Sequence, residues 1–240
     1  MNISVTTDLI SQSRPTRRAR SPSAPLALVS TVGLALLLAL MTVVLLGGGP
    51  AQAQTQDTAG IVRLTFDDGP VYGNTPRILD ILGDYGVQAT FFVVGEEARW
   101  YPDLVWRAYS EGHSVQNHTY THSNLTYLSN AEIEWELRAT NRAIRAAGVP
   151  KPYLFRPPYA ATDARVSSVG AYLGLTQTLW TVDPRDWEDP PAWVICDRVV
   201  SSVGPGSIVL LHEGAGANTA NALPCIITEL RERGYGFGTL

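Results

Sequence analysis

Positive charge is scarce in this 240-residue sequence once the first 53 residues are set aside. Residues 1–53 hold four arginines and a single acid, Asp8, out of 18 basic and 22 acidic side chains in the whole chain. The remainder therefore keeps 14 basic and 21 acidic groups, a net charge of about −7 before histidine. This balance argues against nucleic acid and anionic membrane surfaces as partners.

Charge is missing altogether from residues 26–46, which read "LALVSTVGLALLLALMTVVLL". About 21 apolar residues are enough to span a hydrocarbon core of roughly 30 Å as a helix. The arginines in front of the run predict a cytoplasmic N-terminus. The "AQAQ" at 51–54 offers a signal-peptidase site after Ala53, so residues 1–53 are predicted to be either a cleaved signal peptide or a retained signal anchor helix. In both cases we expect an exported domain, secreted or anchored to the outer face of the cytoplasmic membrane, that meets a membrane only through this segment.

Cysteine is equally scarce, since Cys196 and Cys225 are the only two. In an oxidising compartment a single pair is a candidate disulfide, which would close a loop of about 30 residues. The alternative is two free thiols in the core.

The remaining pattern is regular. After a short polar linker at 54–60, one domain over 61–240 alternates apolar strands with amphipathic helices. No internal repeat is evident. Strands are predicted at 61–66, 89–94, 113–117, 154–156, 175–180, 207–211 and 236–240, and helices at 75–86, 100–110, 129–147, 164–173, 192–202 and 220–233. Such βα units predict an α/β fold with about seven parallel strands, either closed like a barrel or open and doubly wound.

Unusual polar residues follow most of the predicted strands. They form the stretches "DDGP" at 67–70, "HTYTH" at 118–122, "PPYA" at 157–160, "TVDPRDW" at 181–187 and "HEG" at 212–214. Because functional groups collect at the carboxyl ends of parallel strands, we expect these stretches to meet in one site.

His118 and His122 are four residues apart, a spacing that would place both imidazoles on one face of a helix. In the familiar His-Glu-x-x-His zinc motif a glutamate base follows the first histidine, but here that position is Thr119. A base and a further ligand must then come from elsewhere. Taken alone, Asp67 and Asp68 are explained equally well by a solvated turn. Beside two histidines, one carboxylate completes an open His₂Asp metal site and the other can act as a base.

His212, taken alone, is as well explained as a structural histidine. Its place after an apolar strand, together with Asp186, favours a general acid that the carboxylate orients. Arg156 needs a partner near a core, and Asp67 is the obvious one. His113 is predicted to have a structural role.

The domain resembles the polysaccharide deacetylase family, the NodB-homology domain of carbohydrate esterase family four. Five motifs carry the resemblance over residues 61–240, in the order that the family has them. They are "TFDDGP" (65–70), "HTYTH" (118–122), "RPPYA" (156–160), "DPRDW" (183–187) and "LLH" (210–212).

The resemblance implies a distorted (β/α) barrel, a divalent metal that is usually Zn²⁺ with Co²⁺ or others tolerated, and hydrolysis of acetyl groups. Asp68, His118 and His122 would bind the metal. Asp67 would be the general base that activates water, with Arg156 holding it ionised and oriented.

The resemblance also implies roles at the other strand ends. The backbone N–H of Tyr159 would stabilise the oxyanion, and His212, tuned by Asp186, would protonate the leaving amine. Trp187 and Leu210 would wall the pocket for the acetyl methyl group.

Two positions depart from the family pattern, because Ala160 replaces a usual glycine and Glu213 a common aspartate. Neither has a proposed role, so we expect an active, monomeric deacetylase of acetylated glycans. The substrate is expected to be the N-acetyl groups of N-acetylglucosamine units in chitin oligomers or peptidoglycan. The alternatives are an O-acetyl xylan esterase, an inactive glycan-binding module and an unrelated metallohydrolase.

Overall fold

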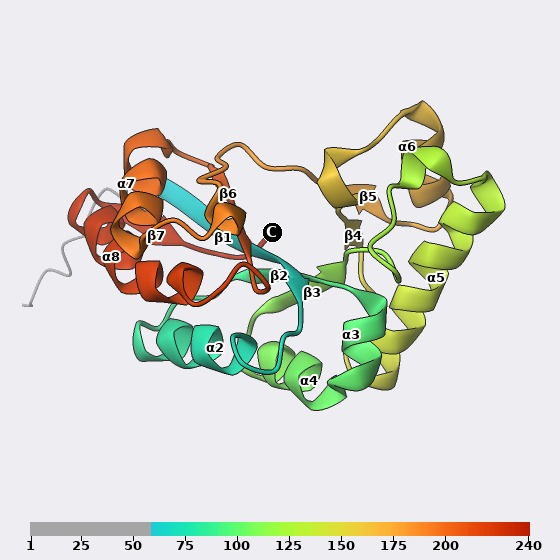
Figure 1. The fold of residues 1–240 in the computed structure, drawn as a ribbon, viewed down its shortest axis with the longest axis horizontal. Coiled ribbons are helices and arrows are strands. Elements are labelled where there is room, and N and C mark those ends of the chain that lie inside the picture. The colour runs from blue at the N-terminus through green and yellow to red at the C-terminus, as the bar shows by residue number, and fades with distance from the viewer. Residues whose placement is uncertain (1–58) are drawn as a thin grey trace, which may run out of the picture. The chain divides into compact units, whose positions relative to one another are not determined.

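The computed structural model describes residues 59–240 (Figure 1). The predicted signal peptide or anchor at 1–53, with its apolar run at 26–46, lies outside the described residues, as does most of the linker at 54–60. Within residues 59–240, no helix is both long and apolar enough to cross a membrane.

The described residues form one seven-stranded sheet in which every strand pair is parallel. The spatial order is β5-β4-β3-β2-β1-β6, and β7 pairs with the beginning of β1. The predicted parallel α/β fold with about seven strands is confirmed. The strands are β1 (Gly60–Gly69), β2 (Thr90–Val93), β3 (Ser114–Asn117), β4 (Leu154–Phe155), β5 (Thr176–Gln177), β6 (Ile208–His212) and β7 (Tyr235–Phe237).

The sheet is partly closed, because the chain after β5 at one end of this order contacts β6 at the other end. The chain that follows β5 returns to β6, where Val182 forms a parallel bridge with Val209 and its carbonyl accepts the Leu210 N–H at 2.9 Å. β4 and β5 have only two residues each, so the sheet is uneven around its circumference. The arrangement is barrel-like, and irregular where β4 and β5 are short.

Seven α-helices connect the strands in the described part of the chain. The 17-residue helix α5 begins with the predicted capping box, in which the Ser129 hydroxyl accepts the Glu132 N–H and the Glu132 carboxylate accepts the Ser129 N–H. The helices are α2 (Thr75–Asp84), α3 (Gly95–Trp100), α4 (Pro102–Ser110), α5 (Asn130–Ala146), α6 (Ala164–Tyr172), α7 (Ala192–Ser202) and α8 (Asn218–Glu232).

The helix predicted over 100–110 is found as α4, which begins at Pro102, whereas α3 before it was not predicted. The two helices are separated at Tyr101, whose φ of −126° and ψ of 55° are not helical. Tyr101 precedes Pro102, and the proline ring disfavours the helical region for the residue before it. Pro102 then occupies the first turn of α4, where its missing N–H costs nothing.

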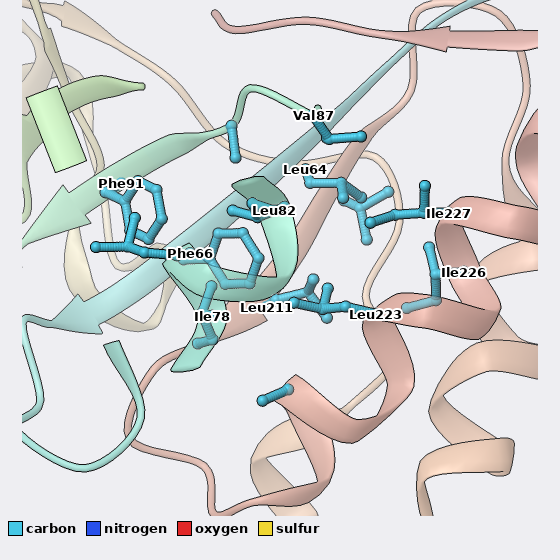
Figure 2. Packing of buried hydrophobic residues seen from close by; sticks show 14 of the residues in the cluster. Leu64, Phe66, Ile78, Leu82, Val87, Phe91, Leu211, Leu223, Ile226 and Ile227 are labelled. Carbon is cyan, nitrogen blue, oxygen red and sulfur yellow. The ribbon is translucent and has the colours of Figure 1, made fainter. Parts of the chain in front are cut away.

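The main core lies between β1, β2 and β6 and the helices α2, α7 and α8. Figure 2 shows side chains of β1, α2 and α8 pointing toward one another, with the ring of Phe66 close to that of Phe91. These two rings stack at 5.1 Å between centroids. Each fully buried Leu, Ile or Phe stabilises the fold by about 1.5–3 kcal/mol. A second cluster, around Leu137 and Phe155, packs α5 and α6 against β4. Together the clusters hold the strand ends in place around the site.

Candidate active site

The polar stretches predicted to meet at the strand ends line one pocket of about 480 Å³. All five predicted stretches contribute to it, from the ends of β1, β3, β4 and β6 and from the loop after β5. The lining residues are Asp67, Asp68, His118, His122, Tyr159, Trp180, Asp183, Trp187, Leu210 and His212.

Asp68, His118 and His122 form the three-residue cluster predicted as the metal ligands. One potential ligand atom from each lies within 4.8 Å of the other two. Asp68 Oδ1 is 3.2 Å from His118 Nε2 and 3.0 Å from His122 Nε2. The tertiary structure thus brings two imidazoles and a carboxylate together at one point, although Asp68 lies some 50 residues before His118 in the chain.

The hydrogen bonds of this cluster fit a bound cation. His118 Nδ1 lies 2.8 Å from the Arg156 carbonyl oxygen, and because a carbonyl only accepts, Nδ1 carries the proton. In the neutral ring this leaves a lone pair on Nε2, directed at Asp68. Among residues 59–240, the buried Asp68 Oδ1 has no hydrogen-bond partner. A neutral imidazole lone pair and a carboxylate oxygen repel each other unless a positive charge lies between the two atoms. The hydrogen bond from His118 Nδ1 to a carbonyl is the outer-shell contact typical of metal-binding histidines.

The electrostatics of Asp68 agree with this need for positive charge. Burial alone would raise the pKa of its carboxyl, but positive charge beside it, which His118 and His122 can supply only when their Nε2 atoms are protonated, outweighs burial and holds the pKa well below the ordinary value. Asp68 is therefore ionised at neutral pH and available as a ligand.

The two histidines lie on a loop and not on a helix, although their spacing is compatible with one. Thr119 and His122 have left-handed backbone conformations, with φ of 67° and 58°. A β-branched residue in this region is uncommon, at a cost of roughly 1–2 kcal/mol. The loop is held by the Thr119 N–H, which donates to Asn117 Oδ1 at 2.8 Å, and by the Gly95 N–H, which donates to the Thr119 carbonyl at 2.9 Å. These contacts hold the strained backbone.

Asp67 is paired with Arg156 as predicted. One guanidinium nitrogen of Arg156 donates to Asp67 Oδ1 at 2.7 Å and to Thr65 Oγ1 at 2.8 Å. Arg156 is fully buried, with its guanidinium carbon 4.1 Å from the centre of the Phe92 ring. A buried guanidinium of this kind is tolerated only when paired, and the Asp67 carboxyl group is its partner. The other oxygen of Asp67 lies 3.7 Å from His118 Nε2.

His212 and Asp186 form the second predicted pair. His212 Nδ1 lies 2.8 Å from Asp186 Oδ1, and the His212 backbone N–H donates to Asp186 Oδ2 at 2.8 Å. The Thr219 hydroxyl donates to the same Oδ2 at 2.7 Å. Burial lowers the pKa of His212, but the bond to Asp186 and the charges of Asp186, Asp67 and Asp68 more than offset it, so that the pKa lies above its ordinary value. His212 therefore favours the protonated form that a general acid needs.

The remaining predicted residues also reach the pocket. Tyr159 places its hydroxyl 3.1 Å from His122 Nδ1, and Trp187 and Leu210 form part of the wall. Tyr159 and Ala160 are both left-handed, with φ of 59° and 53°. This conformation explains why a glycine would suit position 160 and why alanine there is strained.

Several site residues escaped sequence reasoning. Thr65 had a usable signal, because it lies two residues before Asp67 on the same strand and so faces the same side. Trp180 and Asp183 line the pocket directly after β5 and were not singled out individually. Thr219 supports Asp186 from α8, a contact that no local sequence pattern indicates. His113 is buried, accepts the Ala89 N–H at 3.1 Å and lies outside the pocket, which fits its predicted structural role.

Glu213, one of the two departures, is fully buried with its carboxyl group against Gly69 at the end of β1. Its carboxyl accepts a hydrogen bond from the Thr75 hydroxyl. Burial raises its pKa to about 8, and this outweighs the opposing effect of that bond. Glu213 is thus a mostly protonated carboxyl at neutral pH.

Cys196 and Cys225 form a disulfide, with 6.1 Å between their Cα atoms. It joins α7 to α8. The bond lies outside the pocket, so its contribution is to the framework.

Fold and site together define an α/β protein with a candidate metal centre, a buried Asp–Arg pair and a His–Asp pair around one pocket. The family model "Polysaccharide deacetylase" matches residues 54–178. This chain belongs to the polysaccharide deacetylase family and is a hydrolase of that class, as the motifs predicted.

Named relatives and a solved structure agree with the family. A chitooligosaccharide deacetylase of Sinorhizobium fredii is 40% identical over 188 residues, covering 72% of this chain and 87% of the relative. A peptidoglycan-N-acetylglucosamine deacetylase of Bacillus cereus is 36% identical over 184 residues, covering 75% of this chain and 86% of the relative. The family 4 carbohydrate esterase from Streptomyces lividans, solved with acetate, is 40% identical with a TM-score of 0.72, covering 75% of this chain and 93% of that one.

Proposed function

We propose that this protein is a metal-dependent deacetylase that hydrolyses N-acetyl groups of N-acetylglucosamine units in chitin oligomers or peptidoglycan. The observation that carries the proposal is the buried Asp68 Oδ1, which lies 3.0 and 3.2 Å from two imidazole nitrogens without a hydrogen-bond partner among the described residues. Asp68, His118 and His122 would hold a divalent metal, for which Zn²⁺ is the first candidate because two imidazoles and a carboxylate suit it. When bound there, such a metal supplies Lewis acidity, which makes water more acidic and polarises a carbonyl group.

The chain's own residues supply the proton transfers. Asp67, held ionised by Arg156, takes a proton from the water that attacks the acetyl carbon. The backbone N–H of Tyr159 donates to the oxyanion that develops on the carbonyl oxygen. His212, oriented by Asp186, gives its proton to the amide nitrogen as the C–N bond breaks. The products are acetate and a free amine, and Trp187 and Leu210 enclose the acetyl methyl group.

The substrate assignment is supported by the named relatives, which act on chitooligosaccharides and on peptidoglycan N-acetylglucosamine. Exposed aromatic rings near the strand ends, such as those of Tyr159 and Trp187, offer faces on which sugar rings can stack.

The test is acetate release by the purified protein from N-acetylated chitooligosaccharides, peptidoglycan and acetylated xylan, before and after chelation. We expect release from the first two substrates, loss in chelator, and recovery with Zn²⁺ or Co²⁺. In parallel, Asp67→Asn should lose turnover by at least about 100-fold, the lower end of what general base catalysis contributes, while it binds metal as before. Activity that survives exhaustive chelation would rule out the metal, and release from xylan alone would assign an O-acetyl esterase instead.

A further inference from the structure

The carboxyl group of Glu136, on α5, is buried beneath the loop that carries His118 and His122. Only 4% of the residue is exposed. Among the ion pairs formed by residues 59–240, none includes Glu136. A buried carboxylate without a cation beside it is costly unless other donors satisfy it.

Within the described part of the chain, the donors to the Glu136 carboxylate come from the two residues at the centre of that loop. Its Oε2 accepts the backbone N–H of Tyr120 at 2.6 Å and that of Thr121 at 2.9 Å. Its Oε1 accepts the Thr121 hydroxyl at 2.6 Å. These are short, charge-assisted hydrogen bonds, the stronger kind, and they use both oxygens.

The anchored segment lies between the two histidines of the candidate metal site. Thr119 on one side and His122 on the other both have left-handed backbones, so the loop departs from regular structure at the points where it aims the imidazoles. A loop with two uncommon conformations keeps its shape only if neighbouring contacts over-determine it. The carboxylate of Glu136 makes those contacts from a 17-residue helix, which is a rigid support.

We propose that Glu136 is a positioning residue of the metal site. Its carboxylate fixes Tyr120 and Thr121, and through them sets the separation and direction of the His118 and His122 Nε2 atoms toward Asp68. The assignment rests on the proposed binding of a divalent metal by Asp68, His118 and His122.

The test measures metal affinity directly, independent of turnover. Zn²⁺ binding by the full chain is measured by competition with a chromophoric chelator, and the Co²⁺ absorption spectrum reports the ligand geometry. We expect Glu136→Ala to bind Zn²⁺ about 10- to 100-fold more weakly, the usual effect of removing an outer-shell partner, and to change the Co²⁺ spectrum. Glu136→Gln keeps one oxygen for the two backbone N–H groups, so its loss should be smaller but still at least about threefold.

Glu134 provides the matched control, because it lies two residues earlier on the same helix and pairs at the surface with Arg138. Glu134→Ala should bind Zn²⁺ like the unsubstituted protein. Unchanged affinity and spectrum in Glu136→Ala would overturn the proposal, even if that variant were less stable. Should Glu136→Ala fail to fold, unchanged affinity in Glu136→Gln would overturn it equally.

The premise is checked by His118→Ala in the same assay. If the unsubstituted protein binds Zn²⁺ no more tightly than His118→Ala, the metal site itself is wrong and the role of Glu136 falls with it. If the unsubstituted protein binds Zn²⁺ more tightly than His118→Ala does, and the Glu136 variants bind as tightly as the unsubstituted protein, the metal site stands and the positioning role is wrong.

Discussion

At the scale of single residues, three acids around the pocket differ because their neighbours differ. Asp67 is paired with the buried guanidinium of Arg156, and Asp186 accepts bonds from both His212 and Thr219. Glu213 is fully buried, and the Thr75 hydroxyl is the donor to its carboxyl among the described residues. The same functional group thus lies beside a buried guanidinium, accepts from an imidazole and a hydroxyl group, or is buried with a single hydroxyl donor.

The His212–Asp186 pair predicts a shift in the pH dependence of activity. In the proposed mechanism His212 acts in its protonated form, and the Asp186 carboxylate raises its pKa. Asp186→Asn removes that charge, so His212 should lose its proton at lower pH. We expect the alkaline limb of kcat/KM to move to lower pH, because the opposite charge that favours the protonated imidazole is lost.

The measurement is a pH–rate profile of Asp186→Asn beside one of Asp183→Asn. Asp183 also lines the pocket but does not hydrogen-bond to His212, so its variant should keep the position of the limb. If the alkaline limb of the Asp186→Asn profile lies at the same pH as that of the unsubstituted enzyme, the assignment of His212 as the acid is contradicted.

Glu213 predicts a pH-dependent stability. Its folded pKa of about 8 lies above the value of 4.5 for an unperturbed glutamate, so the folded protein binds more protons between these values than the unfolded chain does. The contribution of Glu213 to stability is therefore full below about pH 4.5 and is lost as the pH rises toward 8. Glu213→Gln should not show this loss. The difference in free energy of unfolding between the variant and the unsubstituted protein should therefore change by up to about 1.4 kcal/mol per pH unit.

Urea unfolding of chelator-treated protein, at intervals from pH 5 to 8, measures this difference. A constant offset caused by the new amide does not matter, because only the slope against pH carries the prediction. Parallel stability curves for Glu213→Gln and the unsubstituted protein would show that Glu213 is ionised in the fold.

At the scale of elements, the helices on the two sides of the site are held differently. α7 and α8 are joined covalently by the Cys196–Cys225 disulfide. α5 holds the histidine loop without a covalent bond. Glu136 accepts from the loop, the Leu137 carbonyl and Asn141 Oδ1 accept from the side chain of Asn117, and the Trp135 ring packs against Tyr120. Removal of the disulfide should therefore lower the stability of the fold while it leaves the positions of the metal ligands largely unchanged.

The disulfide gives a prediction of its own. The cysteines are 29 residues apart, and closing a loop of that length reduces the entropy of the unfolded chain by an amount worth roughly 3–4 kcal/mol. The double variant Cys196→Ala, Cys225→Ala should lose about that much free energy of unfolding in urea, while its Zn²⁺ affinity stays the same. A loss below about 1 kcal/mol would show that the bond does little for the folded state.

Local patterns predicted the elements well wherever local chemistry decides them. The capping box at Ser129 and Glu132 marked the beginning of α5, and the apolar stretches located all seven strands within a few residues. The short helix α3 was not predicted, and the helix predicted over 100–110 begins only at Pro102, because the proline ring disfavours helical backbone at Tyr101. Thr219 and Glu136 could not be predicted, because each acts on residues that only packing brings near.

At the scale of the whole molecule, the parallel sheet explains why a scattered set of motifs forms one site. All strand pairs are parallel, so their carboxyl ends lie at the same edge (Figure 1). Motifs that are far apart in the sequence are thus brought close together in space, because each one follows a strand of the same parallel sheet. This is the general reason that α/β sheets place functional groups at that edge.

The amino-acid sequence by itself determined the elements, the family and the identity of the polar groups at the strand ends, because these depend on periodicity, capping and short motifs. Only the tertiary structure decided how those groups meet: that His118 and His122 converge from a strained loop, that Glu213 is buried without a charge partner, and that Glu136 supports the loop. The physical reason is that burial and hydrogen-bond partners are properties of packed neighbours, and those neighbours are distant in the chain.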